Sequence, residues 1–273
     1  MKDFDPDFPV VLGFAGGYCT GKTTTANIIA PAARMVMGSP GGVPIVWDHL
    51  YYALPLYRMA RARQSIEGDL AYDRVLYEIH NTLLEVFGYN PLYGAPKYDD
   101  LIQMVYEIAE YPCPPEDVKP REFLQYVGTE IVRAYDDDAW VKWMDRKIKD
   151  DHRKFLWDHR NFEDENPDSI PFPIYGVVVS DCRFKNEAKL IKDHPNGVLV
   201  KFTVDPEVAQ QRQEKRDGYS MTTSEKNHKS EQSVTHIPDD WYTAVIDSTH
   251  MSPQQQADAV MALTKNSTGA LNA

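Results

Sequence analysis

The residues best suited to chemistry form one short segment near the start of the chain. Residues 16–23, GGYCTGKT, match the pattern G-x-x-x-x-G-K-[ST] in full. An apolar run at 8–15 precedes the segment and a helix-forming run follows it, so the strand, loop and helix that this pattern requires are all expected. A chance glycine turn would have to coincide with both flanks. The sequence therefore predicts a phosphate-binding loop, or P-loop.

The residue types in this loop suit a nucleotide triphosphate. Glycines let backbone N–H groups converge on phosphate oxygens, and the N-terminus of the following helix adds its partial positive charge. Lys22 would neutralise the β- and γ-phosphates, and the Thr23 hydroxyl would bind Mg²⁺. ATP and Mg²⁺ are thus the expected cofactors. The predicted ATP-binding residues are Gly16, Gly17, Tyr18, Cys19, Thr20, Gly21, Lys22, Thr23 and Thr24.

A second charged spot follows the apolar run IYGVVVSD at 174–181. Asp181 ends this predicted strand, and Arg183 comes two residues later. A carboxylate at such a strand end lies beside the P-loop in folds of this kind and can hold Mg²⁺ or its waters. The alternative is that Asp181 only caps the helix predicted at 183–193.

A polar stripe is expected on the helix predicted at 120–134. Arg121, Gln125, Thr129 and Arg133 recur every four residues, and apolar side chains occupy another face. The two arginines are roughly 18 Å apart along an α-helix, too far to grip one phosphate, and Gln125 between them could read a base edge. The alternative is a solvated face of ion pairs, but the stripe itself offers no acidic partner four residues away.

The pattern of apolar runs predicts an α/β fold, with a parallel sheet covered by helices on both faces and an inserted helical acceptor or cap region. We expect strands at 8–15, 45–48, 174–181, 198–204 and 243–247. Helices are expected at 22–37, 50–66, 72–87, 99–110, 120–134, 138–161, 183–193, 206–217 and 252–264. Residues 1–273 would form a single P-loop domain, with its core at about 8–48 and 172–265, an insertion at about 50–165 and a lid at about 205–235.

The predicted lid carries further cations. Arg212, Lys215 and Arg216 could swing over the phosphates and stabilise transition-state charge, or they could pair with acidic neighbours on an ordinary helix face. The polar stretch 218–235 is expected to be a mobile loop. Within it, His228, Ser230 and Glu231 are expected to be structural.

Several blocks in one order carry a family resemblance: the P-loop, WDHL at 47–50, REFLQYVGTE at 121–130, DAW at 138–140, SDCRFKNEA at 180–188 and HKSE at 228–231. Together they resemble the phage-type deoxynucleoside monophosphate kinases over most of residues 9–250. The resemblance implies transfer of the ATP γ-phosphate to a deoxynucleoside monophosphate (dNMP). The loop departs from the Gly-Ser-Gly-Lys-Asp type of many members, and residues 62–119 match nothing in the family.

By the same resemblance, Asp48 would lie near the transferred phosphoryl group, and Asp181 and Arg183 would serve the phosphate and metal region. Trp140 would pack on the acceptor base. The expected catalytic residues are Lys22, Asp48, Arg183, Arg212 and Arg216; the expected acceptor-binding residues are Asp48, Arg121, Gln125, Arg133 and Trp140; and the expected metal ligands are Thr23 and Asp181.

Composition argues against several other classes of protein. A net charge of −12 argues against binding long polyanions, and three dispersed cysteines give neither a disulfide framework nor a zinc site. Without a leader or a long apolar run, the protein is expected to be cytoplasmic and away from membranes. Two rivals stay open: a related kinase acting on a hydroxymethylated base or a polynucleotide, with helix 142–160 as its DNA track, and a nucleotide-dependent switch. A homodimer stays open beside a monomer.

Overall fold

The computed structural model describes residues 4–31, 36–38, 44–64, 71–88, 96–116, 118–159, 173–218 and 228–268. The chain divides into two compact units. Unit 1 comprises Met1–Tyr51, Lys147–Thr222 and Glu231–Ala273, and unit 2 comprises Tyr52–Arg146 and Thr223–Ser230. The prediction of a single kinase domain with an inserted region stays a prediction. No helix among the described residues has the length and apolar character needed to cross a membrane.

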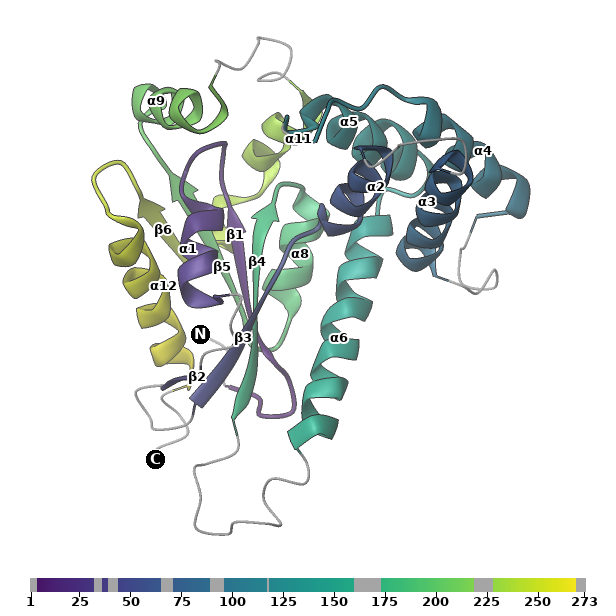
Figure 1. Cartoon of the computed structure of the whole chain (residues 1–273). Coiled ribbons are helices and arrows are strands. Elements are labelled where there is room, and N and C mark those ends of the chain that lie inside the picture. Colours follow the sequence, from purple (N-terminus) through teal and green to yellow (C-terminus); the bar gives the residue numbers. More distant parts are fainter. Residues whose placement is uncertain are drawn as a thin grey trace. The chain divides into compact units, whose positions relative to one another are not determined.

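Unit 1 is built on a mostly parallel sheet (Figure 1). In the described ranges its strands are β1 (Val10–Ala15), β2 (Val36–Gly38), β3 (Pro44–Leu50), β4 (Ile174–Cys182), β5 (Gly197–Thr203) and β6 (Ala244–Asp247). Their order is β2-β3-β4-β1-β5-β6, and β2 alone among these runs antiparallel, at the edge beside β3. The predicted α/β class with a parallel sheet is confirmed. Strand β2 was not predicted.

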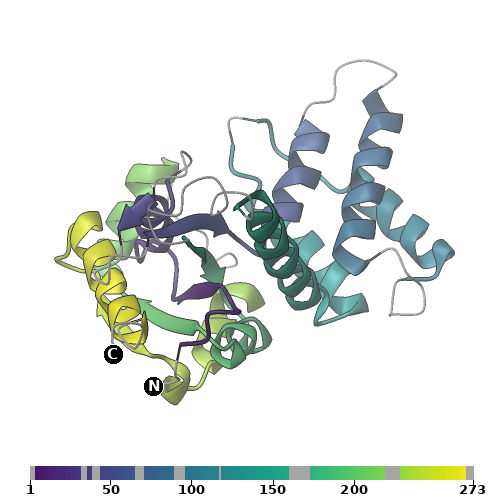
Figure 2. The same cartoon turned by 90° about the horizontal axis from the view of Figure 1, so that it is seen from below.

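Helices cover both faces of this sheet because its strands carry apolar side chains on both sides. On one face, Leu12 and Phe14 belong to the same buried core cluster as residues of α1 (Lys22–Ile29) and α12 (Pro253–Thr268). On the other face, α8 (Lys185–Asp193) packs directly on β1, where a Cβ added to Gly13 would lie 2.8 Å from Ile191. Figure 2 shows α12 and α8 on different sides of the strands.

Helix α1 is shorter than predicted. The expected helix at 22–37 ends at Ile29, and residues 36–38 form β2 instead. Pro31 explains the early end, because proline pushes the residue before it out of the α conformation, and Ala30 has φ −123° and ψ 75°. Residues 32–35, which the prediction also covered, lie outside the described residues.

The rest of unit 1 follows the predicted order, with one exception. Helix α9 (Pro206–Asp217) has the expected bounds, and Asp205 caps it by accepting hydrogen bonds from the N–H groups of Glu207 and Val208. The predicted loop at 218–235 is wrong over its second part, where α11 (Lys229–Gln232) and the 3₁₀ turn η3 (Ser233–His236) form. An ion pair of Glu231 with Arg183 anchors this part. Residues 219–227 lie outside the described residues. A further 3₁₀ turn, η4 (Asp239–Trp241), precedes β6.

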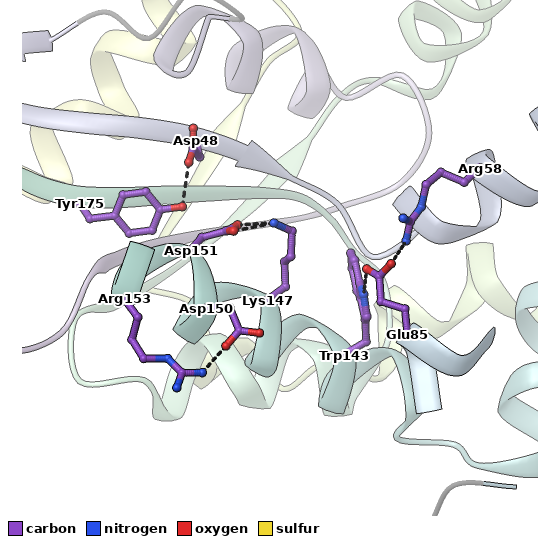
Figure 3. Close-up of polar contacts among 9 residues, drawn as sticks. All are labelled: Asp48, Arg58, Glu85, Trp143, Lys147, Asp150, Asp151, Arg153 and Tyr175. Atoms are coloured by element: carbon purple, nitrogen blue, oxygen red, sulfur yellow. Dashed lines mark hydrogen bonds and ion pairs between the residues drawn. The ribbon is translucent and has the colours of Figure 1, made fainter. Parts of the chain in front are cut away.

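Unit 2 is helical, as predicted. It contains α2 (Leu54–Gln64), α3 (Ala71–Phe87), α4 (Tyr98–Glu110), α5 (Arg121–Gln125), the π-helix η2 (Tyr126–Arg133) and the first part of α6 (Ala139–His159), whose remainder belongs to unit 1. Buried apolar residues such as Ile79, Leu83 and Ile108 form its core. Glu85 on α3 accepts hydrogen bonds from Arg58 of α2 and from the indole of Trp143 of α6 (Figure 3). These contacts tie three helices together.

Candidate active site: a P-loop at the switch point of the sheet

The segment after β1 has the backbone that a phosphate-binding loop needs. Gly16 has φ +144° and a Cβ there would lie 2.3 Å from the carbonyl oxygen of Phe202, so only glycine fits. Gly21 has φ +92°, and Cys19, with φ 53°, is the non-glycine residue with positive φ in the described chain. Positive φ angles turn successive backbone N–H groups toward the inside of the loop, where they can bind an anion. Backbone conformations of this kind cluster at ligand-binding sites.

The loop leads directly into the N-terminus of α1. Gly21 is the N-cap residue and provides no side-chain hydrogen bond, and the first turn contains no acidic residue. The first N–H groups of this helix therefore remain available to an anion. Thr23 and Thr24 lie exposed in this turn. The predicted ATP-binding residues thus form one continuous loop and helix start.

Lys22 folds back over its own loop. Its ammonium donates hydrogen bonds to the carbonyl oxygens of Gly16 at 2.8 Å and Gly17 at 2.5 Å, and to the hydroxyl of Thr20 at 3.0 Å. Burial, and next the charge of Arg183, lower the pKa of Lys22 to about 7. All three donors are engaged with neutral acceptors, so a phosphate can replace them with a stronger, charge-assisted contact.

The loop lies where the strand order of the sheet reverses. Strand β1 has β4 on one side and β5 on the other, and ligands of open α/β sheets bind beyond the carboxyl ends of the strands at such a switch point. The Cα partner of Ala15, which precedes the loop, is Cys182 at the end of β4. This register brings Asp181 and Arg183 next to the end of β1, where the loop begins.

Two cations and three carboxylates lie close enough at this edge for their charges to interact. The pKa of Lys22 is lowered by the charge of Arg183 and raised by the charges of Glu231 and Asp181. Burial opposes the charge of Arg183, but Glu231, Asp181 and Glu187 outweigh it and raise the pKa of Arg183. Glu231 was expected to be structural, and no local pattern could link it to Arg183, 48 residues earlier.

The metal expected with ATP fits this donor set. In the described ranges, no three His, Cys, Asp or Glu side chains gather as a metal site. Mg²⁺ is commonly bound through one or two protein oxygens together with the phosphates and water. The Thr23 hydroxyl and the Asp181 carboxylate would provide such oxygens, and their role as ligands stays a prediction.

Two neighbouring residues of β3 point to opposite faces of the sheet. Asp48 accepts a hydrogen bond from the hydroxyl of Tyr175 at 2.8 Å (Figure 3). The rings of His152 and Phe155 stack on Tyr175. The Cα partner of Asp48 is Val177, four residues before Asp181, which is roughly 13 Å along the strand. Contact of Asp48 with the transferred phosphoryl group stays a prediction.

His49 points the other way, toward α1, and was not singled out from the sequence. Its Nδ1 lies 2.9 Å from Oδ1 of Asn27 and its Nε2 lies 2.7 Å from the hydroxyl of Ser180. Because a carboxamide oxygen only accepts, Nδ1 carries the proton and Nε2 accepts from Ser180. Burial lowers the pKa of His49 to about 4, so the ring is neutral. It links the P-loop helix to the ends of β3 and β4.

The arginines of α9 have different settings. Arg212 donates to the carbonyl oxygen of Ser248 at 2.8 Å, to its hydroxyl at 3.2 Å and to the carbonyl oxygen of Cys19 at 3.4 Å, so it reaches the P-loop itself. Arg216 is exposed and forms two hydrogen bonds with the adjacent Asp217. The movement of these arginines over phosphates stays a prediction.

The polar stripe of unit 2 has a geometry that the sequence did not reveal. The predicted α-helix at 120–134 is one α-helical turn followed by the π-helix η2. In an α-helix, residues four apart advance by about 40° and three such steps rotate a stripe by about 120°. The wider turns of a π-helix reverse this drift. They keep Arg121, Gln125, Thr129 and Arg133 on one face, while Glu122, Glu130 and Ala134 stay exposed.

Three residues of this stripe are buried: Arg121 at 7%, Thr129 at 7% and Arg133 at 5% exposure. The prediction that the stripe has no acidic partner four residues away is wrong for Arg133, which donates to the carboxylate and carbonyl of Asp137. The side-chain nitrogen of Gln125 is buried and has no hydrogen-bond partner within the described residues. The role of these residues in binding an acceptor stays a prediction.

Trp140 lies inside unit 2. It is 3% exposed, and its indole N–H donates to the carbonyl oxygen of Gly128 at 3.0 Å. This bond holds the start of α6 against η2. The predicted contact of Trp140 with an acceptor base is left untested.

Comparison with known proteins gives one partial similarity. The chain is 35% identical over 104 residues to a protein of Acanthamoeba polyphaga mimivirus described as "Putative deoxynucleotide monophosphate kinase". The matched segment is 37% of this chain and 49% of that protein, so the chain spans about half the length of the relative. No family model matches the chain.

Proposed function

We propose that this protein is an ATP- and Mg²⁺-dependent kinase that transfers the γ-phosphate of ATP to a dNMP, giving ADP and the deoxynucleoside diphosphate. The observation that carries the proposal is the P-loop at the switch point, with Lys22, Asp181 and Arg183 at one edge of the sheet. The mimivirus relative supports a kinase in general, and its name supports a deoxynucleotide acceptor. It does not single out the phage-type family.

In this proposal the protein contributes position and charge. The loop N–H groups and Lys22 would bind the β- and γ-phosphates, and Arg183 would stabilise charge on the transferred group. Mg²⁺, when bound, would neutralise phosphate charge and fix the phosphate geometry. In unit 2, Arg121 and Arg133 would lie in the acceptor site, where only one of them would bind the 5′-phosphate. The unpartnered side-chain nitrogen of Gln125 would recognise a base edge.

The rival DNA-kinase reading has less support. The helix proposed as its DNA track corresponds to α6, where Lys147 pairs with Asp151, Arg153 pairs with Asp150 and Lys142 pairs with Asp136 (Figure 3 shows the first two pairs). Cations neutralised in this way release few counterions on binding DNA. The switch reading assigns no ligand to the polar stripe of unit 2, where the buried side-chain nitrogen of Gln125 has no hydrogen-bond partner within the described residues.

The test is a coupled assay of ADP release with dAMP, dCMP, dGMP and dTMP in turn, followed by duplex DNA with 5′-hydroxyl ends. Product analysis by chromatography identifies the phosphorylated species. We expect a deoxynucleoside diphosphate to form from at least one dNMP, and we expect no phosphorylated DNA. ADP release that is independent of every acceptor would refute the kinase proposal, and ATP binding without any ADP release would support the non-catalytic nucleotide-binding switch. Phosphorylated DNA alone would support the polynucleotide kinase.

A further inference from the structure

Two backbone hydrogen bonds hold Arg183 in place at the end of β4. The N–H groups of Arg183 and Phe184 both donate to Oε2 of Glu187, at 2.8 and 3.1 Å. Glu187 is itself buried, and by accepting from the N–H of Phe184 it caps the start of α8. The Cα atom of Arg183 therefore has a fixed position beside the P-loop.

The side chain of Arg183 is held at one end and open at the other. Its Nη1 donates to Oε1 of Glu231, whose side chain is 7% exposed, whereas the Arg183 side chain is 35% exposed. Among the described residues, no hydrogen bond reaches Nε or Nη2 of Arg183. A guanidinium has five donors in a planar fork, so a group anchored through one nitrogen can still donate to a phosphate through the others.

The charges around Arg183 favour this anchor, because Glu231 raises the pKa of Arg183 more than Asp181 and Glu187 do. Arg183 and Lys22 are both cationic and close enough for one charge to lower the pKa of the other. Without a carboxylate beside it, the guanidinium of Arg183 would be repelled from Lys22 and would turn toward solvent. Glu231 offsets this repulsion, since it raises the pKa of both cations.

We propose that Glu231 is a positioning residue of the nucleotide site, which holds the guanidinium of Arg183 so that its open donors contact the γ-phosphate of ATP. Glu231 itself does not touch the nucleotide. This inference rests on the nucleotide site of the proposed function but not on the identity of the acceptor. It gives α11 a role in catalysis that its polar sequence does not suggest.

The experiment measures the contact with the γ-phosphate in the absence of any acceptor. Calorimetry gives the dissociation constants of MgADP and of MgATP or a non-hydrolysable MgATP analogue. The dissociation constant of MgADP divided by that of MgATP measures how much the γ-phosphate contributes to binding. We expect Glu231→Ala to lower this ratio about tenfold, the scale of one charge-assisted hydrogen bond. Arg183→Ala should lower it equally, and the double variant should lower it no further. Glu231→Gln, which keeps an acceptor oxygen, should fall between Glu231→Ala and wild type.

A matched control comes from the same helix that Arg183 precedes. Asp193→Ala removes the exposed ion pair of Asp193 with Lys189 on α8 and should leave the ratio unchanged. Melting temperatures establish that each variant is folded, and Glu231→Gln carries the test if Glu231→Ala unfolds. The inference is overturned if the Glu231 variants keep the wild-type ratio, or if Glu231→Ala lowers it equally with and without Arg183. A wild-type protein that phosphorylates no dNMP would refute the proposed function and leave this ratio measurable.

Discussion

The P-loop of unit 1 and the polar stripe of unit 2 both contain cationic side chains that are largely removed from solvent. The arrangement of the P-loop follows from neighbouring residues, whereas that of the stripe depends on the type of helix. The P-loop is contiguous in sequence, and its shape follows from local backbone preferences at Gly16 and Gly21. The stripe on α5 and η2 is spread over residues 121–133 and faces one way only because the helix takes a π form.

This difference teaches where sequence patterns are informative. A motif whose residues are neighbours along the chain indicates its own geometry. A stripe with a period of four does not, because it rotates one way around an α-helix and the other way around a π-helix. The comparison also predicts different consequences of mutation. Mutations in the P-loop should lower turnover, and mutations in the stripe should lower the affinity for the acceptor.

The largest effect is expected at Lys22. Lys22→Ala removes the charge that the proposal assigns to the β- and γ-phosphates and should lower turnover by about 100- to 1,000-fold. The melting temperature should stay close to wild type, because the Lys22 ammonium contacts loop oxygens rather than the apolar core. Lys189→Ala, at an exposed ion pair on α8, is the matched control. Unchanged turnover in folded Lys22→Ala protein would refute the phosphate-loop assignment.

The next effect concerns acid stability and the polar link beside the P-loop. The pKa of His49 is about 4 in the folded protein, against an ordinary 6.5 in the unfolded chain. Between these values the unfolded chain binds more protons, so stability is complete above pH 6.5 and is lost as the pH falls toward 4. This contribution amounts to roughly 3 kcal/mol.

Denaturant titrations of wild type and His49→Gln across pH 4–7 measure this loss. The variant keeps an amide donor and acceptor but does not titrate, so its stability should fall less steeply than that of wild type. If the free energy of unfolding falls with pH equally in the two proteins, protonation of His49 does not cause the loss of stability.

The stripe of unit 2 should respond through the acceptor alone. Arg121→Ala or Arg133→Ala should weaken the apparent affinity for dNMP by about ten- to a hundredfold, because each would lose a charge-assisted bond, while the affinity for ATP should barely change. Steady-state titrations of both substrates separate the two effects. Asp137→Ala is the control for Arg133, since it removes the ion pair and keeps the arginine. Equal losses for ATP and dNMP would place these arginines outside acceptor binding.

The smallest effect is a pH dependence of nucleotide affinity. The pKa of Lys22 is about 7 before nucleotide binds, and phosphates favour the charged amine, so bound MgATP should raise this pKa. Affinity should therefore be full below pH 7 and fall by up to about tenfold per unit above it. Calorimetry at pH 8 in buffers of different ionisation enthalpy should detect proton uptake on binding. No uptake would mean that Lys22 is already charged or does not meet the phosphates.

Much of the fold could be predicted from the sequence. Alternating apolar runs and helical patterns gave the order of β1, β3, β4, β5 and β6 along the chain and the bounds of most helices. The short strand β2 was missed because Val36 and Met37 were assigned to the end of the helix predicted at 22–37, just before the glycine- and proline-rich stretch at 38–44. The π-helix was missed because its period is close to that of an α-helix over so few residues.

The sequence by itself determined the shape of the loop that is predicted to bind phosphate, because its glycines, Lys22 and Thr23 lie in one continuous segment. Only the tertiary structure decided which distant residues join it. The parallel register of β4 with β1 brings Asp181 and Arg183 to the loop, and the return of the chain at α11 adds Glu231. Alternation along β3 sends Asp48 to one face and His49 to the other. Contacts between residues far apart in the chain depend on strand register and packing, which no local pattern specifies.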